Sequence, residues 1–131
     1  TVVPEDCRVI VDTGCTIAWT MQTWKIKFGQ HIYHDFNNTA MGWSIPATLA
    51  SIAINDDIPT ICLVGDGSLM MNLGDLATLS SQLKPAIVIL LNNGGYSMIK
   101  QTQDQWFDSS YFASNRGPQL PFPDFEIIMM R

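Results

Sequence analysis

The sequence carries little positive charge, and this excludes one class of partner. Its 131 residues include 7 Lys and Arg against 12 Asp and Glu, which gives a formal net charge of −5. Domains that bind nucleic acid usually carry a basic stripe, and these scattered cations do not form one. We therefore expect no nucleic-acid partner.

Long hydrophobic runs are also missing. The longest apolar stretch, residues 45–54, contains Pro46, Thr48 and Ser51, whereas a membrane-spanning helix needs about 20 mostly apolar residues. We therefore predict no membrane partner. The first residues, TVVPEDCR, include neither an initiator Met nor a basic-then-apolar leader pattern. From this we expect a piece of a longer protein or a trimmed start.

The cysteines and histidines form no obvious framework. Cys7, Cys15 and Cys62 are odd in number and contain no CxxC pair, so we expect free thiols and a cytoplasmic protein. Cys62, within ICLVGDG, is expected to be a small buried hydrophobic residue. His31 and His34 have HxxH spacing, but such residues point to opposite faces of a strand. We expect surface or structural histidines there, not metal ligands.

What the sequence does contain is a regular alternation of strand-like and helix-like segments. With 47% hydrophobic and 15% charged residues, the composition is typical of a single globular domain, here residues 1–131. The expected strands are 7–12, 60–67 and 86–95, with a weaker candidate at 31–36. The expected helices are 16–28 (capped by Gly29), 41–54 and 68–83, with two more beginning near Tyr96 and Pro123. This order predicts an α/β fold, an open doubly wound parallel sheet with helices on both faces. The apolar run 86–95 is expected in the middle of that sheet.

Three turns at the predicted strand ends carry chemically useful residues. They are DTGCT (12–16), GDGS (65–68) and NNGGY (92–96), and ligands of such sheets bind beyond the carboxyl ends of the strands. Gly67 allows close backbone approach, and amides at a helix start can hold a phosphate. A carboxylate such as Asp66 beside a phosphate requires a cation, Mg²⁺ or Ca²⁺. Asn93 offers an amide oxygen to the same ion, and the following Gly-Gly turn offers a carbonyl.

Simpler interpretations exist for each turn taken alone. GDG is a common turn in which Asp66 caps a helix, and NNGG is also an ordinary loop sequence. Because each follows a predicted buried strand, the two together favour a metal–diphosphate site. The sequence contains neither GxxxxGK[ST] nor GxGxxG, so nucleotide-type phosphate loops are not supported.

The motifs together resemble a known family. Gly65-Asp66-Gly67, then residues 68–91, then Asn92-Asn93 is similar to the characteristic pattern of thiamine diphosphate enzymes. The resemblance covers nearly the whole chain, through VDTGCT, TAMGWSIPATLASIA, GDGSLMMNLGDLAT and NNGGYSMIKQTQ. These segments resemble the diphosphate-binding domain of the acetolactate synthase and pyruvate decarboxylase superfamily, and acetolactate synthase large subunits most of all.

This resemblance implies thiamine diphosphate and Mg²⁺ as cofactors. The implied metal ligands are the side chains of Asp66 and Asn93 and the carbonyl of Gly95. Met41 would be an apolar wedge beneath the cofactor, and the Thr39 carbonyl would orient its amino group. The residues implied at the diphosphate are Gly14, Cys15, Thr16, Gly67 and Ser68, and those implied beside the diphosphate and thiazolium are Tyr96 and Met98. Core packing is the alternative for the two methionines, and a plain helix start is the alternative for Cys15 and Thr16.

The implied activity is decarboxylation of a small 2-ketoacid, with or without ligation to a second carbonyl. No catalytic residue is expected in this chain, because the family's glutamate comes from a pyrimidine-binding domain or subunit. A homo- or hetero-oligomer is therefore expected. The sequence departs from acetolactate synthases at Thr102, where they usually have Trp between two glutamines.

Two alternative functions follow from the same motifs. The first is a subunit of a two-chain sulfopyruvate- or phosphonopyruvate-type decarboxylase, for which Lys100 is the one basic residue suitably placed. The second is a non-catalytic regulatory domain that retains the fold. The intact Asp66, Asn93 and Ser68 argue against this second alternative.

Overall fold

The computed structural model describes residues 3–54, 57–84 and 86–129. The chain forms two compact units, the first ending at Leu91 and the second beginning at Asn92. Each unit has its own secondary structure and its own internal contacts. The prediction of a single domain over residues 1–131 stays a prediction.

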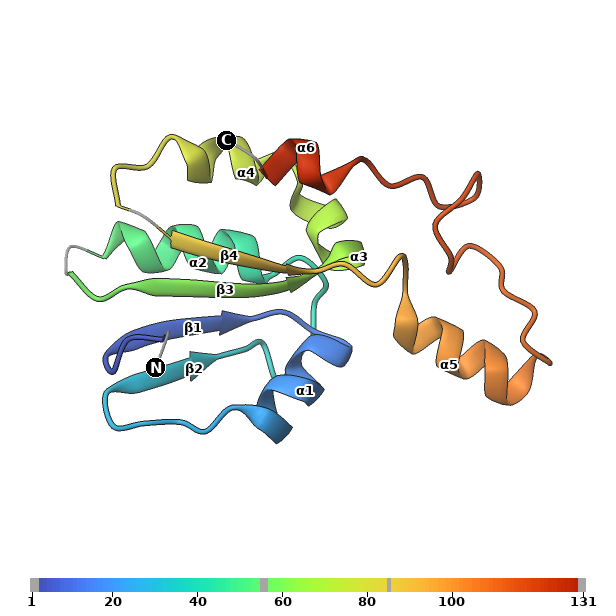
Figure 1. Cartoon of the computed structure of the whole chain (residues 1–131), viewed down its shortest axis with the longest axis horizontal. Helices are drawn as coiled ribbons and strands as arrows, with labels where there is room; N and C mark the ends of the chain where they lie inside the picture. The colour runs from blue at the N-terminus through green and yellow to red at the C-terminus, as the bar shows by residue number, and fades with distance from the viewer. Residues whose placement is uncertain (1–2, 55–56, 85, 130–131) are drawn as a thin grey trace. The chain divides into compact units, whose positions relative to one another are not determined.

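The first unit is built on a four-stranded parallel sheet (Figure 1). Its strands are β1 (Cys7–Val11), β2 (Gln30–Tyr33), β3 (Thr60–Gly65) and β4 (Ala86–Leu91), in the spatial order β2-β1-β3-β4. Every pairing is parallel. The sequence prediction of an all-parallel α/β sheet is therefore confirmed.

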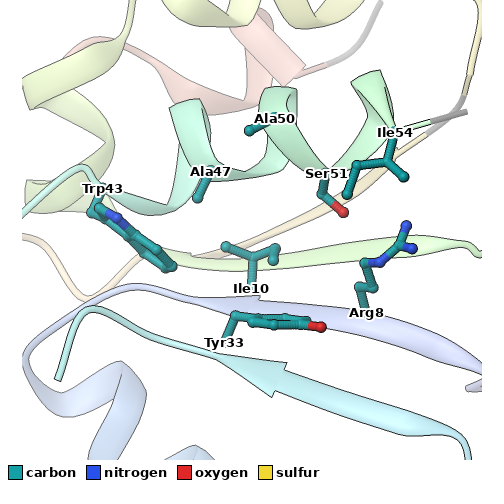
Figure 2. A pocket seen from close by; sticks show the side chains of 8 residues that line it. All are labelled: Arg8, Ile10, Tyr33, Trp43, Ala47, Ala50, Ser51 and Ile54. Atoms are coloured by element: carbon teal, nitrogen blue, oxygen red, sulfur yellow. The ribbon is translucent and has the colours of Figure 1, made fainter.

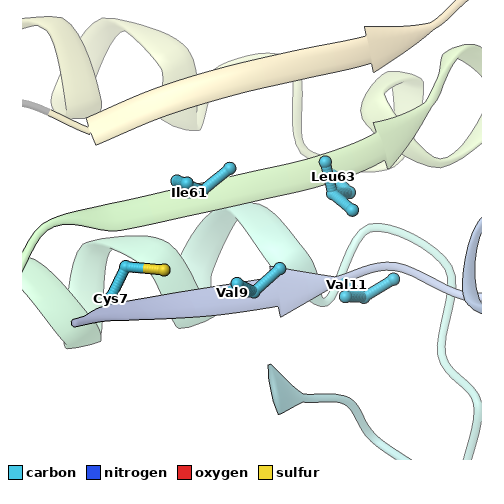
Figure 3. Packing of buried hydrophobic residues seen from close by; sticks show 5 residues of the cluster. All are labelled: Cys7, Val9, Val11, Ile61 and Leu63. Carbon is cyan, nitrogen blue, oxygen red and sulfur yellow. The ribbon is translucent and has the colours of Figure 1, made fainter. Parts of the chain in front are cut away.

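Helices cover both faces of the central strands. On one face, Val9 of β1 and Leu63 of β3 belong to a buried cluster (Figure 3). This cluster packs against Ile17 of α1 (Cys15–Thr23). Alternate residues point to the opposite face, where Thr60 of β3 forms a 2.8 Å hydrogen bond with Ser51 of α2. Helix α2 spans Ser44–Ala53. This is the doubly wound arrangement that the sequence predicts.

Helix α1 is shorter than predicted. It ends at Thr23, not at Phe28, so Gly29 is not its cap. The buried side chain of Gln30 explains the difference, because its Oε1 accepts hydrogen bonds from Trp24 Nε1 (3.2 Å) and from the Lys27 amide (3.1 Å). These bonds hold the segment after α1 in a turn that leads into β2.

The helix predicted over 68–83 is wrong as a continuous element. The structure contains α3 (Asp66–Leu69), a 3₁₀ turn η1 (Met70–Asn72) and α4 (Asp75–Ser80). The break coincides with a long-range contact, since Asn72 Nδ2 donates to the Gly42 carbonyl at 2.8 Å. Gly74 lies two residues after Asn72, directly before α4, and glycine weakens a helix interior by about 1 kcal/mol.

Strand β4 is an edge strand in the described sheet, which corrects the prediction of a central position. Its burial alternates along the strand, and Ile87 and Ile89 are 57% and 42% exposed. An uninterrupted apolar run therefore marks a strand with two apolar faces, but it does not fix the place of that strand in the sheet.

The second unit contains α5 (Ser97–Trp106) and α6 (Phe125–Met129), joined by an irregular segment. Backbone hydrogen bonds tie its start to the middle of this segment: Tyr96 N donates to Ser114 O and Arg116 N donates to Gly94 O, both at 2.9 Å. Among the described residues, no helix is long and apolar enough to cross a membrane.

Candidate functional site

The residues around Asp66 follow the carboxyl end of β3. The Asp66 carboxylate is 1% exposed, and its Oδ1 accepts the Gly67 amide at 2.8 Å. Gly67 and Ser68 are buried beside it in the four-residue helix α3. The sequence predicted this strand-to-turn position, and the structure shows that the acid lies inside the protein.

The start of α1 lies next to this turn. Gly14 has φ 77° and precedes the helix, and no side chain caps the first amides of α1. Thr16 is buried, and a β-carbon placed on Gly65 would lie 3.5 Å from its Oγ1. The structure therefore brings the predicted residues of the first turn, Gly14, Cys15 and Thr16, next to the GDGS turn. A nine-residue helix with uncapped amides is suited to an anion.

The loop between β2 and α2 reaches the same place. It carries Thr39, with φ 51°, and Met41, whose side chain is 41% exposed. A β-carbon on Gly42 would lie 3.0 Å from the Ser68 carbonyl oxygen, so this loop packs against the GDGS turn. Core packing, the alternative considered for Met41, does not fit its exposure.

Asp12 is a buried acid beside these residues to which the sequence analysis gave no role. Its carboxylate is fully buried at the end of β1 and accepts amides from Thr13, Gly42 and Ser44 at 2.9, 3.2 and 2.9 Å. The available signal was an acid directly after an apolar strand, the same signal that selected Asp66.

The remaining predicted residues belong to the second unit. Gly94 and Gly95 have φ 75° and 139°, and a β-carbon on Gly95 would lie 2.1 Å from the Ser114 carbonyl oxygen. Only glycine fits there. The predicted metal ligand Asn93 directly precedes this turn.

Tyr96 and Met98 follow the Gly-Gly turn. Tyr96 precedes α5, and its ring meets that of Phe122 edge-on at 6.2 Å between centroids. Met98, in the first turn of α5, is 50% exposed, which does not fit core packing. The structure therefore groups Gly95, Tyr96 and Met98 within one unit, as their sequence proximity requires.

The cysteines and histidines behave largely as predicted. Cys62 is fully buried, which confirms that prediction, and burial raises the pKa of its thiol. Burial also raises the pKa of Cys7, whereas Cys15 is half-buried. His34 has a structural contact, with Nδ1 2.9 Å from the Val11 carbonyl oxygen. The described residues contain no cluster of three His, Cys, Asp or Glu suited to a metal; the predicted ligands include one such residue, Asp66.

A separate cavity of about 400 Å³ lies between the sheet and α2 (Figure 2). Trp43 and Tyr33 form its aromatic sides, Ala47 and Ala50 line the helix side, and Arg8 lies at one end. None of these is a predicted site residue, so the cavity adds nothing to the cofactor hypothesis.

Comparison with known proteins identifies the kind of domain. A family profile described as "Thiamine pyrophosphate enzyme, C-terminal TPP binding domain" matches residues 12–130. The chain is 28% identical to the acetolactate synthase isozyme 1 large subunit of Escherichia coli K12, over 92% of this chain and 21% of that protein. It is also 28% identical to acetolactate synthase 2, chloroplastic, of Brassica napus, over 91% of this chain and 20% of that protein. The chain thus spans about a fifth of the length of these relatives.

Proposed function

Because this chain belongs to the family of C-terminal TPP-binding domains of thiamine pyrophosphate enzymes, we propose that it binds thiamine diphosphate with Mg²⁺ in an acetolactate synthase-like enzyme. The enzyme would act on a small 2-ketoacid as a decarboxylase or carboligase. When bound, the cofactor supplies the electron sink for loss of CO₂, and the protein supplies binding and orientation.

One observation carries the proposal: three separate segments with predicted cofactor residues converge in the first unit. Thr16 lies against Gly65, and the loop that bears Met41 packs against Ser68. These residues are far apart in the sequence and share no role in the main hydrophobic cluster. Convergence at the carboxyl ends of β1 and β3 is what a ligand site of this fold requires.

The residues present also fit the chemistry of the group. The uncapped amides of α1 suit a diphosphate, and a buried carboxylate such as Asp66 suits a hard cation. We assign the Asn93 side chain and the Gly95 carbonyl to the same Mg²⁺. The support for this assignment is the membership of the chain in this family.

The working enzyme would require a pyrimidine-binding domain, fused or separate, to supply a glutamate to the cofactor. A homo- or hetero-oligomer follows from that need. The relatives named above favour the acetolactate synthase-like function over a sulfopyruvate- or phosphonopyruvate-type enzyme and over a non-catalytic domain. Three free cysteines suit a reducing compartment, for which we propose the cytoplasm.

Titration calorimetry of the chain with thiamine diphosphate tests the proposal. Saturable binding near one cofactor per chain is expected in the presence of Mg²⁺. Absence of binding at millimolar cofactor, to a chain whose circular dichroism shows it is folded, would contradict the proposal.

Met41 gives a prediction about turnover. In the enzyme formed with its pyrimidine-binding domain, we expect Met41→Ala to lower kcat by about 10²-fold, because a small misplacement of reacting groups has an effect of this size. The affinity for thiamine diphosphate should change less. The physical reason is that an apolar wedge sets the cofactor's shape, whereas the diphosphate and metal provide most of the affinity. Steady-state kinetics and calorimetry measure the two effects, and Met71→Ala, an exposed methionine of η1, is the matched control. Equal losses of kcat and affinity would contradict the wedge role.

Cys15 gives a prediction about protection. We expect saturating thiamine diphosphate and Mg²⁺ to slow alkylation of Cys15 by iodoacetamide, up to about 100-fold at a ligand concentration of 100 Kd. The thiol is half-buried at the start of α1, where the diphosphate is proposed to bind. Peptide mass spectrometry reads each cysteine separately, and the buried Cys7 and Cys62 should react slowly with or without ligand. If Cys15 is alkylated at the same rate with and without thiamine diphosphate and Mg²⁺, the prediction that Cys15 lies in the cofactor site is wrong.

A further inference from the structure

Asp12 joins two segments that are distant in the sequence. Its Oδ1 accepts the amides of Thr13 (2.9 Å) and Gly42 (3.2 Å), and its Oδ2 accepts the amide of Ser44 (2.9 Å). The carboxylate has 0% exposure, so water does not solvate it. Three amide donors are the kind of compensation that a buried carboxylate needs.

Gly42 is held from its other side as well. Its carbonyl accepts Asn72 Nδ2 at 2.8 Å, and its φ is +83°. A β-carbon at this position would lie 2.8 Å from the Met71 β-carbon and 3.0 Å from the Ser68 carbonyl oxygen. The peptide of Gly42 is therefore fixed between the end of β1 and the GDGS region, with no room for a side chain.

The preceding part of the loop is organised by a second acid. Thr39 N donates to the Asp35 carbonyl at 2.7 Å, and Asn38 Nδ2 donates to Asp35 Oδ1 at 3.2 Å. Met41 lies between the two fixed segments, and its side chain is 41% exposed. Packing within the described chain therefore leaves much of that side chain uncovered, so its position depends on the backbone that carries it.

From this geometry we infer that Asp12 is a positioning residue for the cofactor site. Its carboxylate fixes the Gly42–Ser44 peptides and thereby sets where Met41 and the Thr39 carbonyl meet thiamine diphosphate. The inference rests on the proposed function and deepens it. Asp12 itself contacts neither metal nor cofactor in this account, because its oxygens are occupied by amides.

The matched substitution is Asp12→Asn, which keeps the shape and removes one acceptor oxygen. Whichever way the amide group is oriented, its NH₂ faces a backbone N–H, so at least one of the three hydrogen bonds is lost. Exchange of the Gly42 and Ser44 amides with deuterium should accelerate by roughly tenfold or more, the factor for one net hydrogen bond to a charged group. Asp124→Asn is the control, because Asp124 also accepts backbone amides but does so at the exposed start of α6.

The test of function compares two quantities, the affinity for thiamine diphosphate and the circular dichroism of the bound cofactor. Calorimetry should show thiamine diphosphate affinity within about threefold of wild type, because the diphosphate and the metal provide most of the affinity. The near-ultraviolet circular dichroism of the bound cofactor should fall in Asp12→Asn and stay unchanged in Asp124→Asn. Asn72→Ala removes the hydrogen bond to the Gly42 carbonyl. It should likewise lower the dichroism signal while leaving the affinity for thiamine diphosphate nearly unchanged.

The outcomes separate the two proposals. If wild type does not bind thiamine diphosphate, the proposed function fails and the positioning role fails with it. If wild type binds and Asp12→Asn retains both slow exchange and the full dichroism signal, only the positioning role is overturned. Equal loss of affinity and signal in folded Asp12→Asn would indicate a general structural role and would also overturn it.

Discussion

Asp66→Ala is expected to abolish Mg²⁺-dependent binding of thiamine diphosphate. The Asp66 carboxylate is buried directly after β3, where it would repel a diphosphate unless a cation lies between them. Loss of a residue that merely supports a metal ligand costs 10- to 100-fold in affinity, so loss of a ligand itself should cost more than about 10²-fold. Titration calorimetry in Mg²⁺ and in EDTA measures this directly.

Two controls make the result interpretable. Asp75→Ala removes another acid from a first helical turn, that of α4, and should leave the affinity unchanged. Thermal unfolding of Asp66→Ala checks that the chain still folds, since the lost hydrogen bond to Gly67 should cost about 1 kcal/mol. If wild type binds the cofactor equally well in Mg²⁺ and in EDTA, Asp66 has no metal to hold.

The sheet could be predicted from the sequence because a strand can carry two signals, an apolar run and a residue that ends the run. In β3, for example, residues 61–64 are all apolar, and the run ends in Gly65 followed by Asp66, an acid that does not continue a buried apolar strand. The register of the strands and the edge position of β4 could not be predicted in this way. Strand order depends on which segments meet in three dimensions, and periodicity within one segment carries no such information.

Helix ends were predicted less well, for a similar reason. Apolar spacing extends past Thr23 to Phe28, yet the chain turns because the Gln30 side chain bonds back to Trp24 and Lys27. The break after Leu69 depends on the contact of Asn72 with Gly42. Both are side-chain contacts with segments beyond the helix itself, and these override local helix propensity.

The same difference between local patterns and distant contacts applies to the proposed site residues. Asp66, Gly67 and Ser68 could be proposed from the sequence because a short local motif contains them. Asp12 was missed because two of its three amide donors come from residues 30 and 32 positions later. The position of Asp12 directly after an apolar strand is visible in the sequence, but the distant backbone amides that it binds are revealed only by the folded structure.

The isolated 131-residue chain is expected to be catalytically silent even when it binds its cofactor. Catalysis of this type needs an acid at the aminopyrimidine N1′. Such acid–base assistance is typically worth about 10²–10⁴-fold in rate. Without it, the rate of pyruvate decarboxylation should approach that of free thiamine diphosphate with Mg²⁺.

The acids of this chain give no candidate for that role. Asp66 is assigned to the metal, and Asp12 is occupied by three backbone amides. Asp35 organises its own loop, and Asp124 caps α6. The remaining acids have no motif context of an N1′ partner: Glu5, Asp6, Asp56, Asp57, Asp75, Asp104, Asp108 and Glu126. Under the proposed function, the glutamate would then come from a pyrimidine-binding domain.

Mixing experiments test this requirement. Pyruvate decarboxylation would be measured with the purified chain alone, and again after addition of a separately purified pyrimidine-binding domain of a thiamine diphosphate enzyme. The chain alone should match free cofactor, and a substitution such as Asp66→Ala should not lower that rate further. Turnover well above free cofactor by the chain alone, at concentrations where it is monomeric, would show that an acid within these residues does serve N1′. The separate glutamate would then be unnecessary, and the oligomer inferred from it would lose its basis.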